Sequence, residues 1–222
     1  LGQTIYFTLL VMALCLIVGY PVAYFLAMQV SSFGWQMSLF LLAMVPFWTS
    51  YLLRVFAWKV VLGYEGVINS ALMSLGMIEA PLEFLLYSQT AVIITLAHAW
   101  AAFAVLPMYV SLEKIDKSLL EAATDLGDGP VMRFLRITLP LSLPGIMSAT
   151  LLIFIPTTGD YITPALLGGP DGMMIGNLIQ KQFGAINNWP MGATLAIILM
   201  LSITVIVMGF LFTTNFARKR IS

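Results

Sequence analysis

Residues 121–140 read EAATDLGDGPVMRFLRITLP and gather charge in a chain that is otherwise mostly apolar. Ser118 and Glu121 have the spacing of a capping box, so a helix is expected to begin at Lys117 or Ser118. Gly127 can adopt a positive φ and end that helix. The first half of the stretch is therefore predicted to be a short helix followed by a turn.

A second short helix is expected after the turn, because Pro130 is tolerated in the first turn of a helix. Apolar residues then recur at helical spacing, with Arg133 and Arg136 on the opposite side. Pro140 is expected to stop this run. The whole stretch is predicted to be a compact helix-turn-helix with an apolar surface and a few charges.

The composition is that of an integral membrane protein. The chain has 222 residues, of which 60% are hydrophobic and 9% are charged. Soluble domains carry roughly 25% charged residues. The net charge is zero, so no nucleic-acid partner is indicated. Cys15 is the single cysteine, which excludes an internal disulfide and a cysteine metal cluster.

Five apolar segments are long enough to cross a membrane, which takes roughly 20 mainly apolar residues. The expected spans are residues 5–28, 37–62, 89–110, 141–167 and 191–216. Short helices are expected between spans at residues 67–78, with Asn69 on the polar side, and at residues 174–183. The chain is thus predicted to be an all-α membrane protein with one transmembrane domain over residues 1–222.

The charges indicate which loops lie in the cytoplasm, where lysine and arginine concentrate in membrane proteins. Two basic groups are expected there: Lys114, Lys117, Arg133 and Arg136 after the third span, and Arg218, Lys219 and Arg220 after the fifth. The opposite side then carries Glu65, Glu79, Glu83 and Asp171. Counting back from these loops places Leu1 outside.

The charged stretch resembles the cytoplasmic coupling loop of ABC importer permeases. That signature is Glu-Ala-Ala, three residues, Gly, nine residues, Ile, one residue and Leu-Pro. This chain matches it at Glu121, Ala122, Ala123, Gly127, Ile137, Leu139 and Pro140. The resemblance implies that residues 111–140 dock on an ATP-hydrolysing subunit and carry its motion into the membrane. The alternative is that Glu121 only caps its helix and Gly127 only ends it, and both roles can hold together.

Other segments resemble the permeases of spermidine/putrescine importers, in particular their B-type subunit. They are GYPVAYFLA (19–27), VPFWT (45–49), SLEKID (111–116), IGNLI (175–179) and NWPMGA (188–193). The resemblance implies an all-α bundle of the type I (MetI-like) importer fold and a paralogous second permease as heterodimer partner. It also implies two ATP-binding subunits that hold ATP and magnesium, and a periplasmic solute-binding protein. Since such permeases start inside, a sixth helix is expected before Leu1.

Asp160 is the only carboxylate inside an expected span, and an ionisable residue there is a functional candidate. The segments after Pro46 and Pro156 both place hydroxyls and aromatic rings in a span. A polyamine needs carboxylates for its ammonium groups and aromatic faces for cation–π contacts. The expected substrate path is Asp160, Tyr161, Thr158, Trp48 and Tyr51. Alternatively, Asp160 only bonds the kinked backbone near Pro156 or Pro164.

Two cations in the second expected span leave several readings open. Arg54 and Lys59 could extend to lipid head groups, pair with Glu65, or face the path, where they would favour an anion. His98, in the third span, is expected to be a packed hydrogen-bonding residue.

We expect a multi-pass transport subunit of the bacterial inner membrane and not an enzyme, since no nucleophile–base set, metal-ligand cluster or phosphate-binding glycine loop is found. The expected function is ATP-driven import of a small solute, a polyamine such as spermidine or putrescine. One alternative is an importer permease for another solute, such as an amino-acid derivative or an oxyanion. The others are an ion-coupled secondary transporter, for which one carboxylate in the spans is little, and a structural membrane scaffold.

Overall fold

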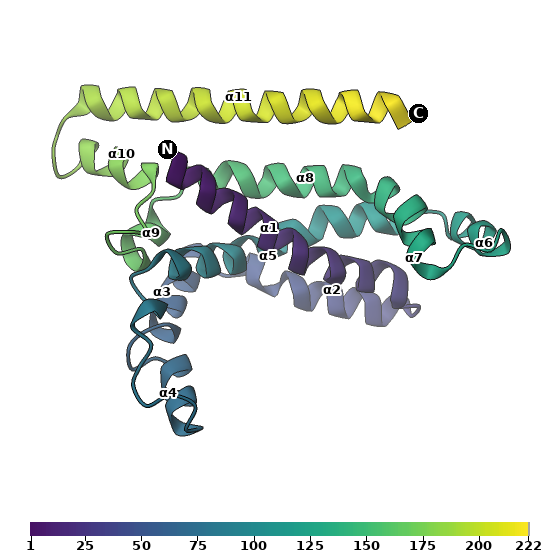
Figure 1. The fold of residues 1–222 in the computed structure, drawn as a ribbon, viewed down its shortest axis with the longest axis horizontal. Helices are drawn as coiled ribbons and strands as arrows, with labels where there is room; N and C mark the ends of the chain where they lie inside the picture. Colours follow the sequence, from purple (N-terminus) through teal and green to yellow (C-terminus); the bar gives the residue numbers. More distant parts are fainter. Residues whose placement is uncertain (222) are drawn as a thin grey trace. The chain divides into compact units, whose positions relative to one another are not determined.

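The computed structural model describes the backbone of residues 1–221 and the side chains of residues 1–214, and its ordered elements are helices (Figure 1). They are α1 (Gly2–Tyr24), α2 (Phe33–Trp48), α3 (Tyr51–Val61), α4 (Val67–Ser74), α5 (Gln89–Glu113), α6 (Lys117–Asp125), α7 (Pro130–Arg133), α8 (Leu139–Thr158), α9 (Ile162–Leu167), α10 (Ile175–Phe183) and α11 (Trp189–Ile221). Two π-helical turns (Phe25–Gln29 and Phe134–Thr138) and a 3-10 turn (Glu83–Leu85) complete them. Arg218, Lys219 and Arg220, predicted to be cytoplasmic, lie outside the residues whose side chains are described.

Four helical segments are long and apolar enough to cross a membrane, and a fifth crossing is reached if α2 and α3 form one span. The four are Gly2–Gln29, Gln89–Glu113, Pro130–Thr158 and Trp189–Thr214. The all-α membrane architecture expected from the composition is therefore confirmed.

The second expected span, residues 37–62, is wrong as a single straight helix, because α2 and α3 meet at an angle of 89°. Pro46 has no backbone N–H for the helix. Its carbonyl accepts hydrogen bonds from both the backbone N–H (3.4 Å) and the hydroxyl (2.8 Å) of Thr49. These bonds close α2, and Tyr51 begins α3 in a new direction.

The fourth expected span, residues 141–167, is interrupted as well. α8 ends at Thr158 and α9 begins at Ile162. The prediction that Pro140 stops the preceding run is also wrong, since one helical segment continues from Pro130 to Thr158. The π-helical turn before Pro140 explains this continuity: its wider hydrogen-bonding pattern makes room for a proline, which has no N–H to donate.

The chain folds as two compact units, each built from segments that are distant in sequence. The first unit contains Leu1–Thr8, Trp58–Val92 and the residues from Ile155 onward. The second unit contains Leu9–Ala57 and Ile93–Phe154.

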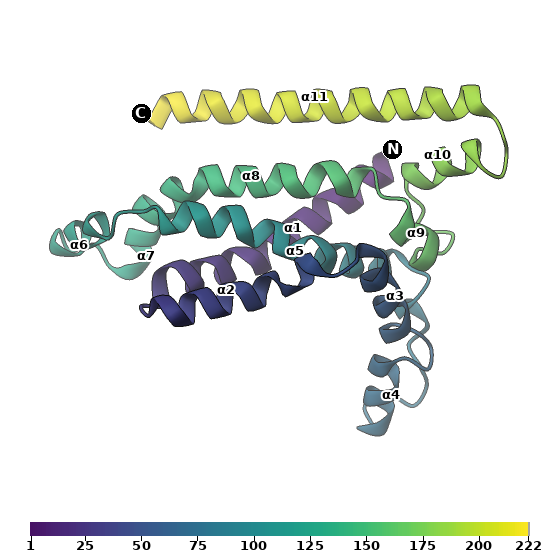
Figure 2. The ribbon, with the colours of Figure 1, turned by 180° about the vertical axis from the view of Figure 1, so that it is seen from behind.

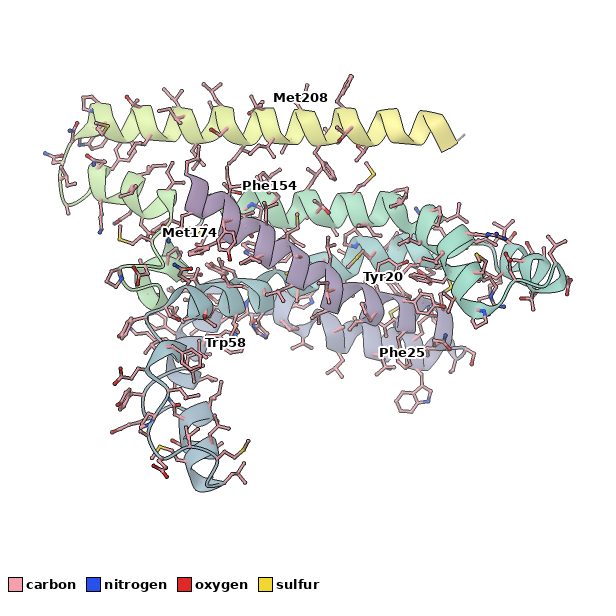
Figure 3. All side chains as sticks on the ribbon, in the orientation of Figure 1. Tyr20, Phe25, Trp58, Phe154, Met174 and Met208 are labelled. Atoms are coloured by element: carbon pink, nitrogen blue, oxygen red, sulfur yellow. The ribbon has the colours of Figure 1, made fainter. Side chains whose placement is uncertain are left out.

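In the second unit, α5 and α8 run side by side in both views (Figures 1 and 2). A Cβ placed on Gly145 of α8 would lie 2.6 Å from the carbonyl oxygen of Pro107 on α5. The two backbones can approach this closely only because the residue is glycine, as is common where membrane helices cross. On α1, the Tyr20 hydroxyl lies 2.8 Å from Ser142 Oγ of α8 (Figure 3).

In the first unit, α10 packs against the beginning of α11, where the rings of Phe183 and Trp189 meet edge to face at 5.5 Å. The short helix expected over residues 174–183 is confirmed as α10. The other short helix, α4, ends at Ser74, earlier than expected. Asn69 was predicted on its polar side but is only 1% exposed, because it donates to the Gly63 carbonyl (3.1 Å) and accepts from the Leu82 N–H (2.9 Å).

Candidate functional site

The predicted coupling segment, residues 111–140, begins with a helix whose cap differs from the expected one. α6 begins at Lys117, as predicted, but Asp116 caps it by accepting a hydrogen bond from the Ser118 N–H at 2.9 Å. The capping box of Ser118 and Glu121 is therefore wrong. The backbone and hydroxyl of Ser118 both donate to Asp116, which holds the pKa of this carboxyl below its ordinary value. Because Glu121 is not needed as a cap, its exposed side chain is available for another role.

The end of α6 forms as the sequence predicts. Gly127 has a φ of +89°, a conformation that residues with a Cβ rarely adopt. The N–H of Asp128 donates to the Ala123 carbonyl (2.9 Å), and the N–H of Gly127 donates to the Thr124 carbonyl (2.9 Å). This pair of bonds is a Schellman motif, which fixes the direction in which the chain leaves the helix.

Side chains then tie the turn to the second helix. Arg136 forms an ion pair with Asp128 at 3.0 Å, and Arg133 donates to Thr124 Oγ1 at 2.5 Å. Exposed ion pairs stabilise a fold by only about 0–1 kcal/mol, but these two contacts both limit the same turn. α6 and α7 are therefore held together as one body at the end of the α8 segment (Figure 1).

The signature residues of this segment separate into two groups by burial. Glu121, Ala122 and Gly127 are exposed, and they share the surface with apolar side chains such as Leu126, which is 87% exposed. Ala123 is buried, while Ile137, Leu139 and Pro140 are partly buried where the segment joins α8. Glu121 also lines a cavity of about 240 Å³ together with Lys117 and Arg133. An exposed apolar face with few charges is suited to binding a second protein.

The predicted path residue Asp160 lies in the break between α8 and α9, and not within a continuous span as expected. Its Oδ1 accepts from the Ile162 N–H (3.1 Å) and its Oδ2 from the Thr163 N–H (3.3 Å). The carboxylate is 8% exposed. Asp160 therefore caps the first turn of α9, which corresponds to the alternative of a bond to the backbone near Pro164. Its place on a substrate path stays a prediction.

Two further predicted path residues flank Asp160 in the first unit and have opposite environments. Thr158 is buried at the end of α8, with its Oγ1 3.5 Å from the Thr8 hydroxyl. Tyr161 is 46% exposed and lines a cavity of about 500 Å³ with Gln180 and Phe183. Of the three residues, Tyr161 is thus the one whose ring is open to a ligand.

The other two predicted path residues belong to the second unit, at the bend between α2 and α3. Trp48 is 82% exposed, and its ring meets that of Phe47 edge to face at 5.8 Å. Tyr51 stacks on Trp100 of α5, with the ring centroids 5.7 Å apart. The bend therefore presents one free aromatic face and one packed ring.

The two cations that left several readings open both contact tyrosine rings. Arg54 donates to the Ala99 carbonyl at 2.8 Å, and its guanidinium carbon lies 6.0 Å from the centroid of the Tyr51 ring. The Lys59 ammonium lies 5.8 Å from the centroid of the Tyr87 ring. Such cation–π contacts hold a positive charge within the protein.

Asn177 was quoted in a sequence motif without a role, and its position was missed by the sequence reasoning. Its side chain is 4% exposed and bridges the start of α10 to the break after α8. The available signal was an asparagine at the third position of a predicted helix, where a side chain can reach back to the capping residue.

Comparison with known proteins places these features in a family. A model of the family described as binding-protein-dependent transport system inner membrane component matches residues 3–221. The spermidine/putrescine transport system permease protein PotB of Escherichia coli (strain K12) is 41% identical over 207 residues, which cover 93% of this chain and 72% of that protein.

Two solved structures share the fold. A bacterial ABC transporter that imports the acidic polysaccharide alginate has a chain that aligns with a TM-score of 0.71 at 22% identity, covering 98% of this chain and 78% of that chain. The MetNI methionine ABC transporter, in an inward-facing conformation, aligns with a TM-score of 0.68 at 16% identity, covering 100% of this chain and 94% of that chain.

Proposed function

Because the chain belongs to the family of binding-protein-dependent transport system inner membrane components, we propose that it carries polyamines such as spermidine and putrescine across the inner membrane. The observation that carries the proposal is the 41% identity over 93% of the chain to a permease named for these two substrates. The same family membership confirms the resemblance to ABC importer permeases and the type I fold expected from it.

The family also sets which tasks belong to this chain and which to others. The chain is a multi-pass inner-membrane permease and does not itself hydrolyse ATP, which is bound by a separate ATPase subunit. A periplasmic binding protein delivers the solute. We further propose a complex in which this chain pairs with a paralogous second permease and the two permeases engage two ATPase subunits.

The predicted coupling segment supports a mechanical route for ATP energy. Its exposed face, with Glu121 and Leu126, is proposed to dock on the ATPase. The turn at Gly127 and the contacts of Arg133 and Arg136 make this face one body with α7. From there a single helical segment continues to Thr158, two residues before Asp160. ATP can shift the equilibrium between outward and inward access only through its different contacts in the two states.

The path residues support a cationic substrate. A polyamine is a chain of ammonium groups joined by methylenes, which a carboxylate such as Asp160 and aromatic faces such as Tyr161 and Trp48 would accommodate. Arg54 and Lys59, which would favour an anion if they faced the path, lie over Tyr51 and Tyr87 instead. The substrate contacts are expected to be weak, since a tightly held solute would not leave the membrane.

The test is transport by the complete complex in vesicles with ATP, using radiolabelled spermidine loaded on the cognate binding protein. We expect uptake that unlabelled spermidine and putrescine compete for and that inorganic phosphate does not. Transport that is blocked by an anion and unaffected by both polyamines would assign the chain to an oxyanion importer. Absence of any ATP-dependent uptake with any loaded binding protein would contradict the transport role itself.

A further inference from the structure

The break between α8 and α9 lies directly against the first turn of α10. A Cβ placed on Gly176 of α10 would be 2.7 Å from the carbonyl oxygen of Asp160 and 3.1 Å from that of Gly159. Both contacts are with backbone atoms, so a larger residue could be placed only by moving one segment away from the other. The glycine therefore marks a close approach between α10 and the residues predicted to line the substrate path.

Asn177, the next residue of α10, joins the two segments with its side chain. Its Oδ1 accepts from the Met174 N–H at 3.0 Å, and its Nδ2 donates to the Tyr161 carbonyl at 2.8 Å. These partners determine how the amide is oriented, because a backbone N–H needs an acceptor and a carbonyl needs a donor. Met174, labelled in Figure 3, is also buried, so both bonds lie away from water.

The start of α10 is held from a second direction as well. The Ile175 N–H donates to Thr4 Oγ1 on α1 at 2.8 Å, and Thr4 is buried. The Tyr161 carbonyl also accepts the first intrahelical bond of α9, from the Ala165 N–H at 3.1 Å. The backbone of Tyr161 is thus fixed between α9 and Asn177, while its ring remains exposed to the cavity of about 500 Å³.

We propose that Asn177 is a positioning residue for transport, which holds the Tyr161 backbone so that its ring faces the passing substrate. The proposal rests on the proposed polyamine function for its transport readout. The bond that matters is the one donated by Nδ2 to Tyr161, whereas the bond accepted by Oδ1 serves only to cap α10. Gly176 is the second part of this device, because it allows α10 to approach the break.

Three variants separate positioning from capping. Asn177→Asp keeps the acceptor that caps α10 and removes the donor to Tyr161, whereas Asn177→Leu removes both. Gly176→Ala keeps Asn177 but displaces α10 from Asp160. The matched control is Asn188→Asp: Asn188 is exposed, and its Oδ1 caps the start of α11 by accepting from the Met191 N–H at 3.2 Å.

The readout is the number of spermidine molecules transported per ATP hydrolysed in reconstituted complexes, a ratio that does not depend on how much complex assembles. We expect it to fall about tenfold in Asn177→Asp and in Gly176→Ala, the equivalent of about 1.4 kcal/mol, and to be unchanged in Asn188→Asp. A purely capping role predicts a normal ratio in Asn177→Asp and a defect only in Asn177→Leu, and that result would overturn the proposal.

A second measurement does not need transport. A Tyr161→Cys chain in membranes is labelled with a maleimide, with Cys15 expected to stay protected because it is only 1% exposed. Adding Asn177→Asp should change the labelling rate at residue 161 severalfold, and adding Asn188→Asp should not. Equal rates in all three chains would overturn the positioning role, whichever solute the importer carries. Wild-type complexes without polyamine uptake but with altered labelling would instead reject the polyamine and keep the positioning role.

Discussion

Gly145 of α8 lies so close to Pro107 of α5 that a Cβ on the glycine would be 2.6 Å from the proline carbonyl oxygen. The same Cβ would also lie 2.5 Å from Cβ of Ser111, so no small side-chain rotation would relieve the contact. This crossing joins the helix that enters the predicted coupling segment to the helix that leaves it. A change at Gly145 therefore tests whether the second unit depends on this close packing.

Gly145→Ala is expected to destabilise the solubilised protein by about 1–3 kcal/mol, the usual effect of overpacking a core. Gly209→Ala on α11 is the matched control, because no atom lies within 4 Å of its added Cβ. The control should be neutral or more stable by up to about 1 kcal/mol, since alanine favours helix over glycine. Thermal unfolding in detergent measures both, and equal melting temperatures would show that α5 and α8 can separate without cost.

Replacing Glu121 should affect coupling and leave stability alone. Asp116, and not Glu121, caps α6, so Glu121→Ala removes only an exposed charge. If this charge bonds the ATPase, its loss is expected to reduce binding-protein-stimulated ATP hydrolysis about tenfold, as for one hydrogen bond to a charged group. Asp125→Ala, another exposed carboxylate of α6, is the control. Full stimulation in Glu121→Ala would remove Glu121 from the docking surface.

Gly127→Leu should uncouple the complex by a different cause, the direction of the chain after α6. Its φ of +89° is strained for a residue with a Cβ, so the Schellman turn is expected to reorganise at a cost of roughly 1 kcal/mol or more. Gly129→Leu is the control, since Gly129 has a φ of −68° and open space around its Cβ. We expect assembly in both variants and loss of stimulated ATP hydrolysis only in Gly127→Leu. The same loss in both would point to bulk on the surface, and not to the turn.

These two residues also show what a sequence can predict in this fold. The positive φ of Gly127 is a local requirement, and the spacing of the signature residues is local too, so both could be inferred without a structure. The capping residue was misplaced because Asp116 competes with Ser118 for the first free N–H groups of the same helix. Such competition depends on one or two bonds, which residue spacing alone does not rank.

The breaks within the spans could not be predicted for another reason. Hydropathy measures burial in lipid, and the residues on both sides of the bend at Thr49 and of the break at Asp160 are apolar. What permits the breaks is polar closure by a few groups, such as the Thr49 hydroxyl on Pro46 and the Asp160 carboxylate on Thr163. Asn69 and Asn177 were overlooked similarly, because their partners lie in other segments of the chain.

The cap of α6 has a predictable pH dependence. Hydrogen bonds from Ser118 lower the pKa of Asp116 from its ordinary 3.8, so the folded helix favours the ionised carboxyl. Its contribution to stability is therefore fully present above pH 3.8 and is lost as the pH falls through the lowered folded-state pKa. A carboxyl-carbon NMR titration of the solubilised protein should give a midpoint below 3.8 for Asp116. In Ser118→Ala, which loses one of the two donors, the midpoint should move upward, and no movement would show that the hydroxyl takes no part.

Asp160→Asn tests whether the capping carboxylate also acts on the substrate. Asparagine keeps the size and one acceptor oxygen, so it can still bond the Ile162 or the Thr163 N–H, but it has no charge. Losing one of the two capping bonds should cost about 1 kcal/mol, too little to prevent assembly. If ammonium groups pass this carboxylate, spermidine uptake should fall about tenfold or more while basal ATP hydrolysis continues, because a charged hydrogen bond is worth about 1.5–3 kcal/mol.

Asp171→Asn provides the comparison, since Asp171 is an exposed carboxylate of the same unit. If uptake is normal in both variants, Asp160 acts only as the cap of α9, and the substrate contacts must come from aromatic residues such as Tyr161. If uptake falls equally in both, the outer surface charge, and not the path, attracts the polyamine. Only a selective loss in Asp160→Asn gives this residue two roles, which is physically consistent: a capping carboxylate uses two of its roughly four lone-pair sites, so the others can accept from an ammonium group.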